Sequence, residues 1–169
     1  ADFKDGLPTT SIRHFESVFH SYVGMEAPEC TMMKECGPYV VIEHNGNVYS
    51  CDFFVEPKWK LGNIMQERII NMLNSKTQQT FGAAKAILPR ECRTCNWLRN
   101  CYGGCLKDRI KDPEDHRKPR FCATTKMFLK HADPTLKVMA EQWKEQQAIQ
   151  QVKQQTGGVY NAFKDFMKD

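Results

Sequence analysis

The stretch CRTCNWLRNCYGGC, residues 92–105, decides the fold, because four of its cysteines follow the spacing C-x2-C-x5-C-x3-C. The C-x2-C step lets two side chains from one tight turn bind the same metal. Gly103 and Gly104 have no Cβ, so the backbone here can approach a bulky inorganic group closely. We therefore expect the chain to fold around metal held by cysteine. The other cysteines of the chain are Cys30, Cys36, Cys51 and Cys122.

Eight cysteines in 169 residues allow three kinds of chemistry. Iron–sulfur clusters take four thiolates each, so eight cysteines supply two clusters with none left over. Two four-thiolate zinc sites would use the same number, although a zinc ribbon repeats C-x2-C and this chain contains that step once. Four disulfides are the third alternative, disfavoured because ADFKDGLPTT at the N-terminus shows no secretion signal. Spacing alone favours iron–sulfur and leaves zinc and disulfides open.

Composition and charge exclude some classes of function. The net charge of +4 is weak, and the most basic stretch, residues 107–120, also carries four acidic residues. Such a mixed stretch indicates a solvated loop, so we expect no nucleic-acid partner. No apolar stretch is long enough to cross a bilayer, so we expect no membrane partner and a cytoplasmic location.

The hydrophobic pattern predicts an α+β fold, in which a small β-hairpin, helices and loops wrap around two iron–sulfur clusters. Asn45-Gly46 between two β-branched runs is the hairpin signal, and it places Cys36 and Cys51 at the two ends of the hairpin. Apolar residues spaced three and four apart predict the helices. The expected elements are helices over 9–24, 63–73, 79–87 and 134–155, a hairpin over 39–50, and loops around metal over 91–122.

The cysteine pattern resembles that of a known family. Cys36 to Cys51 reads C-x9-G-x4-C, and with the run from Cys92 to Cys105 and the late Cys122 it resembles the seven-cysteine SPASM signature of radical SAM enzymes. Cys30 matches the extra ligand of members with two fully ligated auxiliary clusters. CGPYVVIEHNGNVYSCDFFVEPKWKLGNI together with CRTCNWLRNCYGGC resembles anaerobic sulfatase-maturating enzymes in particular. The resemblance covers roughly residues 30–122.

The resemblance implies that the ligands of two 4Fe–4S clusters interleave along the chain. The first auxiliary cluster would take Cys30, Cys36, Cys51 and Cys105. The second auxiliary cluster would take Cys92, Cys95, Cys101 and Cys122. Such crossing resembles two-cluster ferredoxins, and it would link the hairpin to the later loop and stabilise a small module.

The resemblance also points to Asp52, which directly follows Cys51. The matching aspartate of sulfatase maturases is the proposed proton acceptor at the substrate. Oxidation of a Cys or Ser side chain to an aldehyde needs hydrogen abstraction at Cβ, loss of a proton and removal of a second electron, and a carboxylate can take the proton. The ordinary alternative is a strand-end aspartate that accepts a bond from a nearby backbone N–H.

The implied function is that of an auxiliary-cluster module in an oxidoreductase that converts a Cys or Ser of a sulfatase to formylglycine. Its partners would be the sulfatase polypeptide and an electron donor or acceptor such as ferredoxin or flavodoxin. The C-x3-C-x2-C motif for S-adenosylmethionine is absent from this chain, since Asp108 stands where the third cysteine would follow Cys101 and Cys105. The resemblance therefore implies a missing N-terminal domain with S-adenosylmethionine and a third 4Fe–4S cluster, and an inactive isolated chain.

The expected organisation is a linker helix or barrel remnant over 1–25, a SPASM-like two-cluster domain over 26–130 and a helical tail over 131–169. Three other functions stay open. They are a SPASM module of another peptide-modifying maturase, a ferredoxin-like electron carrier, and a redox-silent, zinc-stabilised interaction module. Basic side chains that would partly balance cluster charge, or lie on solvated surface, are Lys107, Arg109, Arg117 and Lys118.

Overall fold

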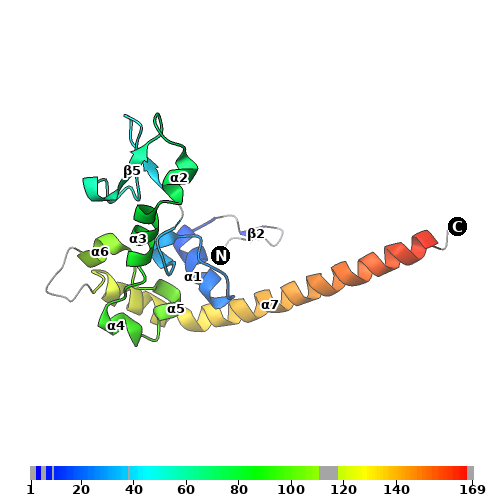
Figure 1. The fold of residues 1–169 in the computed structure, drawn as a ribbon. Coiled ribbons are helices and arrows are strands. Elements are labelled where there is room, and N and C mark those ends of the chain that lie inside the picture. The colour runs from blue at the N-terminus through cyan, green and yellow to red at the C-terminus, as the bar shows by residue number, and fades with distance from the viewer. Residues whose placement is uncertain (1–2, 5–6, 9, 38, 111–117, 167–169) are drawn as a thin grey trace.

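The computed structural model describes residues 3–4, 7–8, 10–37, 39–110 and 118–166. Figure 1 shows a small sheet at one end of the body, short helices in the middle, and a single long helix that extends away from the body. The fold is α+β, as predicted. The strands are β1 (Phe3–Lys4), β2 (Leu7–Pro8), β3 (Val41–Ile42), β4 (Asn47–Tyr49) and β5 (Lys60–Asn63). The helices are α1 (Arg13–Tyr22), η1 (Cys30–Met32), η2 (Pro57–Trp59), α2 (Ile69–Leu73), α3 (Lys76–Ala84), α4 (Arg90–Arg93), α5 (Leu98–Cys101), α6 (Leu106–Ile110) and α7 (Cys122–Phe166).

The predicted hairpin is confirmed as strands β3 and β4, and β5 joins them to give an antiparallel sheet of order β3-β4-β5. The Gly46 N–H donates to the Glu43 carbonyl (2.8 Å), and Gly46 has a φ of 79°, which glycine adopts without strain. Val48 on the central strand is fully buried. The sheet therefore holds the segment before Cys51 in a fixed position.

Strand β5 was not predicted, because Asn63 was interpreted as a helix cap. The Asn63 side chain instead ties the end of β5 to the hairpin, donating to the Asn45 carbonyl and to Asn47 Oδ1, both at 3.1 Å. The helix expected over 63–73 is consequently reduced to α2. The helix expected over 79–87 is α3, which starts earlier because the Ser75 hydroxyl caps it by accepting the Gln78 N–H (3.2 Å).

The region expected to be loops around metal contains the short helices α4, α5 and α6, so the prediction of irregular structure was wrong there. The bounds expected for the last helix were also wrong, since α7 begins at Cys122 and continues through Pro134 and Gly157. Proline removes one helical hydrogen bond, but packing on α1 holds both sides of Pro134. Phe128 stacks on Phe15 (5.5 Å between ring centroids). The side chains expected to form an apolar face in the tail, Val159, Phe163 and Phe166, lie outside the described side chains.

The interior has two apolar clusters. The first lies between α1 and α7, with Tyr22, Trp97, Phe128 and Leu136 packed against it. The second joins the sheet region to α3 and α6, and Phe81 contacts Phe54 and Trp59 there in edge-on geometry. The buried residues of the first cluster are Val18, Ala27, Met32 and Leu129. The buried residues of the second cluster are Cys51, Phe54, Phe81 and Leu106.

Across the described part of the chain, no helix combines the length and apolar character needed to cross a membrane.

Candidate metal centres

All eight cysteines are free thiols, and the fold gathers them into two groups. The first cysteine group consists of Cys30, Cys36, Cys51 and Cys105. The second cysteine group consists of Cys92, Cys95, Cys101 and Cys122. These groups have the same members as the two ligand sets implied by the family resemblance.

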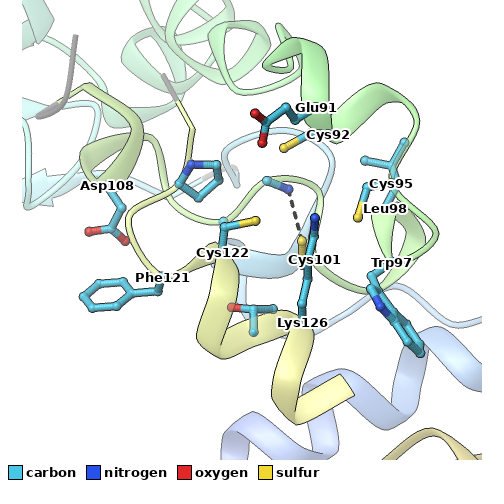
Figure 2. Close-up of a pocket in the computed structure, with 14 residues that line it drawn as sticks. Glu91, Cys92, Cys95, Trp97, Leu98, Cys101, Asp108, Phe121, Cys122 and Lys126 are labelled. Carbon is cyan, nitrogen blue, oxygen red and sulfur yellow. Dashed lines mark hydrogen bonds between the residues drawn. The ribbon is translucent and has the colours of Figure 1, made fainter. Parts of the chain in front are cut away.

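The second cysteine group lines one small cavity of about 70 Å³. Figure 2 shows its four sulfur atoms directed toward the same space from α4, the following turn, the end of α5 and the start of α7. The Gly103 N–H donates to Cys101 Sγ (3.4 Å), which orients this sulfur. Trp97 and Leu98 close the cavity on one side, and Phe121 lies on another. The arrangement is an enclosed, largely apolar pocket with four thiols.

A sharp turn separates Cys101 from Cys105 and sends them to different groups. Tyr102, Gly103 and Gly104 all have positive φ values, of 44°, 75° and 64°. A Cβ on Gly103 would lie 3.5 Å from Cys92 Sγ, so a larger residue would combine backbone strain with crowding of the thiol. The glycines predicted to allow close approach do so at this turn.

The first cysteine group is assembled from distant segments around Tyr39. The Tyr39 hydroxyl lies 3.4 Å from Cys30 Sγ and 3.7 Å from Cys51 Sγ, so it sits between the two sulfurs. The Cys36 N–H donates to the Gly82 carbonyl (3.2 Å), which anchors this cysteine to α3. Cys105 precedes α6 directly.

Electrostatics identify the neighbours within each group. Burial raises the pKa of the Cys36 thiol to about 11, and the thiolates of Cys105, Cys51 and Cys30 add to the increase. Burial also raises the pKa of Cys92, with further contributions from the other three members of the second group. The four thiols of a group thus disfavour one another's ionisation, and a bound metal would supply the positive charge that reverses this preference.

The donor set fits iron–sulfur chemistry. Both groups consist of soft thiolate donors, which suit iron–sulfur clusters as well as zinc. Within the described ranges, no three His, Cys, Asp or Glu side chains are close enough to hold one metal ion. In a 4Fe–4S cluster each thiolate binds its own iron, and four sulfurs around a common space match that requirement.

An open cavity of about 1050 Å³ lies beside the first cysteine group. Cys30, Cys105, Tyr39 and Asp52 all line this cavity, which we call the groove. Asp52 is exposed in the turn that follows Cys51, and its Oδ1 accepts a hydrogen bond from Cys51 Sγ (3.3 Å). The structure therefore places a carboxylate at the groove beside the first group.

Positive side chains in the groove lie close to Asp52 in the sequence or in the fold. Arg13, Lys107 and Arg120 line the groove. The Lys107 ammonium lies 3.3 Å from the centroid of the Phe53 ring, a cation–π contact next to Asp52. The groove is therefore a mixed surface of charged and aromatic groups.

The sequence did not single out Tyr39 or Lys85, although both contact the first group. Neither residue belongs to a motif, and only the tertiary fold brings them to the cysteines. Among the cations expected to balance cluster charge, Arg109 is buried, and Lys118 pairs with Glu91 (3.1 Å). Arg117 lies outside the described residues.

Comparisons with known proteins give the family. Residues 30–96 match the family described as SPASM, an iron–sulfur cluster-binding domain. The serine-type anaerobic sulfatase-maturating enzyme of Bacteroides thetaiotaomicron is 36% identical over 148 residues, covering 86% of this chain and 36% of that protein. A cysteine-type anaerobic sulfatase-maturating enzyme of Clostridium perfringens is 32% identical over 136 residues, covering 80% of this chain and 36% of that protein.

A solved structure named native anSMEcpe with bound AdoMet and Cp18Cys peptide superposes with a TM-score of 0.71. It is 30% identical, and the match covers 79% of this chain and 37% of that one. The chain thus spans about a third of the length of the relatives it matches. Sequence and fold agree that this chain is a SPASM iron–sulfur region of the kind found in the C-terminal part of anaerobic sulfatase-maturating enzymes.

Proposed function

We propose that the chain holds two 4Fe–4S clusters, one on each cysteine group. The proposal is supported by the grouping of eight free thiols into two sets of four. When bound, the clusters supply one-electron transfer. The residues of this chain hold them, shield the second with Trp97 and Phe121, and leave the first beside the groove. Residues 26–130 would form the two-cluster domain, with a linker helix before it and a helical tail after it.

We further propose that this region serves an oxidoreductase that converts a Cys or Ser of a sulfatase to formylglycine. S-adenosylmethionine and a third 4Fe–4S cluster would belong to an N-terminal domain beyond this chain, and the chain alone would be inactive. Abstraction of a hydrogen atom from Cβ there would leave a substrate radical. That radical must then lose one proton and one electron to become the oxidised product. A ferredoxin or flavodoxin would exchange electrons with the clusters, and the cytoplasm would provide the reducing setting.

One observation carries the assignment of this chain's part. Asp52, Cys30 and Cys105 line the same groove. A substrate side chain held in the groove would have a proton acceptor and an electron-accepting centre beside it. Asp52 would take the proton, and the substrate electron would enter the site of the first cysteine group. The aromatic and basic groups of the groove would hold the peptide around that side chain.

The cluster content is tested by measuring iron, acid-labile sulfide and zinc per chain after anaerobic purification and reconstitution. About eight irons and eight sulfides are expected for two 4Fe–4S clusters. About two zincs without sulfide would instead indicate a structural module, and the electron-transfer role would be lost with it.

The role of Asp52 is tested with Asp52→Asn in the full-length enzyme. We expect a loss of about 10²–10⁴-fold in turnover, the usual contribution of a positioned acid or base, with iron content unchanged. Glu56→Gln is the matched control, because Glu56 is an exposed carboxylate of the same loop. Undiminished turnover in Asp52→Asn would exclude Asp52 as the proton acceptor.

A further inference from the structure

Two cations are buried beside the cysteine groups. Lys85 is 1% exposed and Arg109 is 2% exposed. Neither forms a salt bridge with a carboxylate within the part of the chain that the structure describes. A buried charge without a partner is strongly destabilising, so these two cations require an anion nearby. The anions in reach are the cysteine thiolates.

Arg109 lies between the two groups. Its guanidinium donates to the Lys85 carbonyl (2.8 Å) and the Ile87 carbonyl (3.2 Å), which fixes its position. The same Cβ position on Gly103 that is 3.5 Å from Cys92 Sγ is 3.7 Å from Arg109 Cζ. The guanidinium therefore lies close to the second cysteine group, while α6 attaches it to the end of the first.

The electrostatic neighbours of Arg109 come from both groups. Burial lowers the pKa of Arg109, and the thiolates that oppose this shift are those of Cys92, Cys36, Cys105 and Cys101. Two of these belong to the first group and two to the second. A single positive charge thus interacts with both sites.

Lys85 interacts with the first group alone. Its ammonium donates to the carbonyls of Cys30 and Met33, at the ends of the turn that carries Cys30. The thiolates that act on it are those of Cys36, Cys30 and Cys105. Lys85 thus both positions the Cys30 segment and places positive charge beside the first site.

We propose that Arg109 and Lys85 form a buried cationic bridge that raises the reduction potentials of the clusters, Arg109 acting on both and Lys85 on the first. The inference rests on the proposed two-cluster function. Reduction adds one negative charge to a cluster, and a nearby cation stabilises the reduced form more than the oxidised form. The bridge therefore favours transfer of the substrate electron into the first site, where two cations act together.

The experiment is a potentiometric titration, followed by EPR, of the full 169-residue chain loaded with clusters. Arg109→Met should lower both midpoints, each by at least a tenfold change in the reduction equilibrium, about 59 mV for one electron. Lys85→Met should lower the midpoint of the first cluster alone. The two midpoints are assigned with Cys101→Ala, which lacks a ligand of the second cluster.

Two control variants separate charge from shape. Lys76→Met removes an exposed lysine at the other end of α3 and should leave both midpoints unchanged. Arg109→Lys keeps the charge and should keep both midpoints near those of the unchanged chain. If Arg109→Met fails to retain iron while Arg109→Lys retains it, the charge requirement is supported.

Several results would overturn the bridge. Unchanged midpoints in Arg109→Met with full iron content would remove its electrostatic role. Equal loss of iron in Arg109→Met and Arg109→Lys would assign Arg109 a purely geometric role. These outcomes affect this inference alone. Zinc without sulfide in the unchanged chain would overturn the proposed function, and this inference with it.

Discussion

The two cysteine groups are built in opposite ways. The second group comes from one stretch of chain, residues 92–122, and encloses a cavity of about 70 Å³ beside the apolar cluster between α1 and α7. The first group is drawn from residues 30–105 and borders a groove of about 1050 Å³ that also contains Asp52. An enclosed site is suited to storing and passing an electron, and an open site to meeting a substrate. The fold thus separates these tasks by the surroundings of chemically identical ligands.

Removal of both clusters is the strongest way to break the comparison, because it should abolish the two sites together. Metal-binding free energy is folding free energy in small metal-dependent domains, on the order of 10 kcal/mol per structural site. We expect the iron-free chain to lose its cooperative thermal transition, measured by circular dichroism under anaerobic conditions. Unchanged cooperative unfolding without iron would show that the apolar clusters suffice.

Single ligand substitutions should separate the two groups. Cys105→Ala and Cys101→Ala should each lower the iron content by about half, because a 4Fe–4S cluster takes four thiolates. Hydrogen exchange should then differ, since Cys105→Ala releases the segment of Cys30 and Cys51 whereas Cys101→Ala releases the loop of Cys95.

Double substitutions check the partition. Cys105→Ala with Cys36→Ala should lose no more iron than Cys105→Ala alone, because both ligands belong to one site. Cys105→Ala with Cys92→Ala should lose nearly all iron. The reverse pattern would mean that Cys105 belongs with the second group.

Truncation in the apolar clusters should distinguish the supports of the two sites. Phe81→Ala should destabilise the chain by about 3–5 kcal/mol, because Phe81 is 2% exposed and packs on Phe54 and Trp59. Chemical denaturation of the cluster-loaded chain measures this loss. The first cluster should dissociate earlier than the second, since Cys51 shares the apolar cluster of Phe81. Leu129→Ala, in the other apolar cluster, should reverse the order, and an identical order in both variants would contradict this prediction.

The smallest expected effect comes from Tyr39→Phe, which removes one hydroxyl between Cys30 Sγ and Cys51 Sγ. Hydrogen bonds to the cluster sulfurs raise the reduction potential. The midpoint of the first cluster should therefore fall, by an amount on the order of tens of mV, while that of the second stays constant. A redox titration checks this, and equal shifts in both midpoints would contradict a local effect.

Local signals in the sequence predicted local features well. Asn45-Gly46 predicted the hairpin, because the turn depends on the residues within it. The metal chemistry also followed from cysteine spacing, since ligands close in sequence share a turn. The boundaries of α7 did not follow, because packing on α1 outweighs the preference of Pro134 to begin a helix.

Features that depend on distant segments could not be predicted in the same way. Asn63 ends a strand because the hairpin offers it partners eighteen residues away. Lys85 has no sequence signal for its burial, because the carbonyls that receive its ammonium come from the segment of Cys30. The matched pairs of ligands came from family resemblance, and spacing alone left them undecided.

The turn at Tyr102–Gly104 has a consequence for how the module is made. The turn holds Cys101 and Cys105 on opposite sides of three consecutive residues with positive φ. A cluster that captures one of these cysteines also orients the other, so filling one site lowers the entropy cost of closing the second. Loading should therefore be cooperative, and half-filled molecules should be scarce during reconstitution. The turn then acts as a checkpoint in maturation, selecting for chains that carry both clusters or neither.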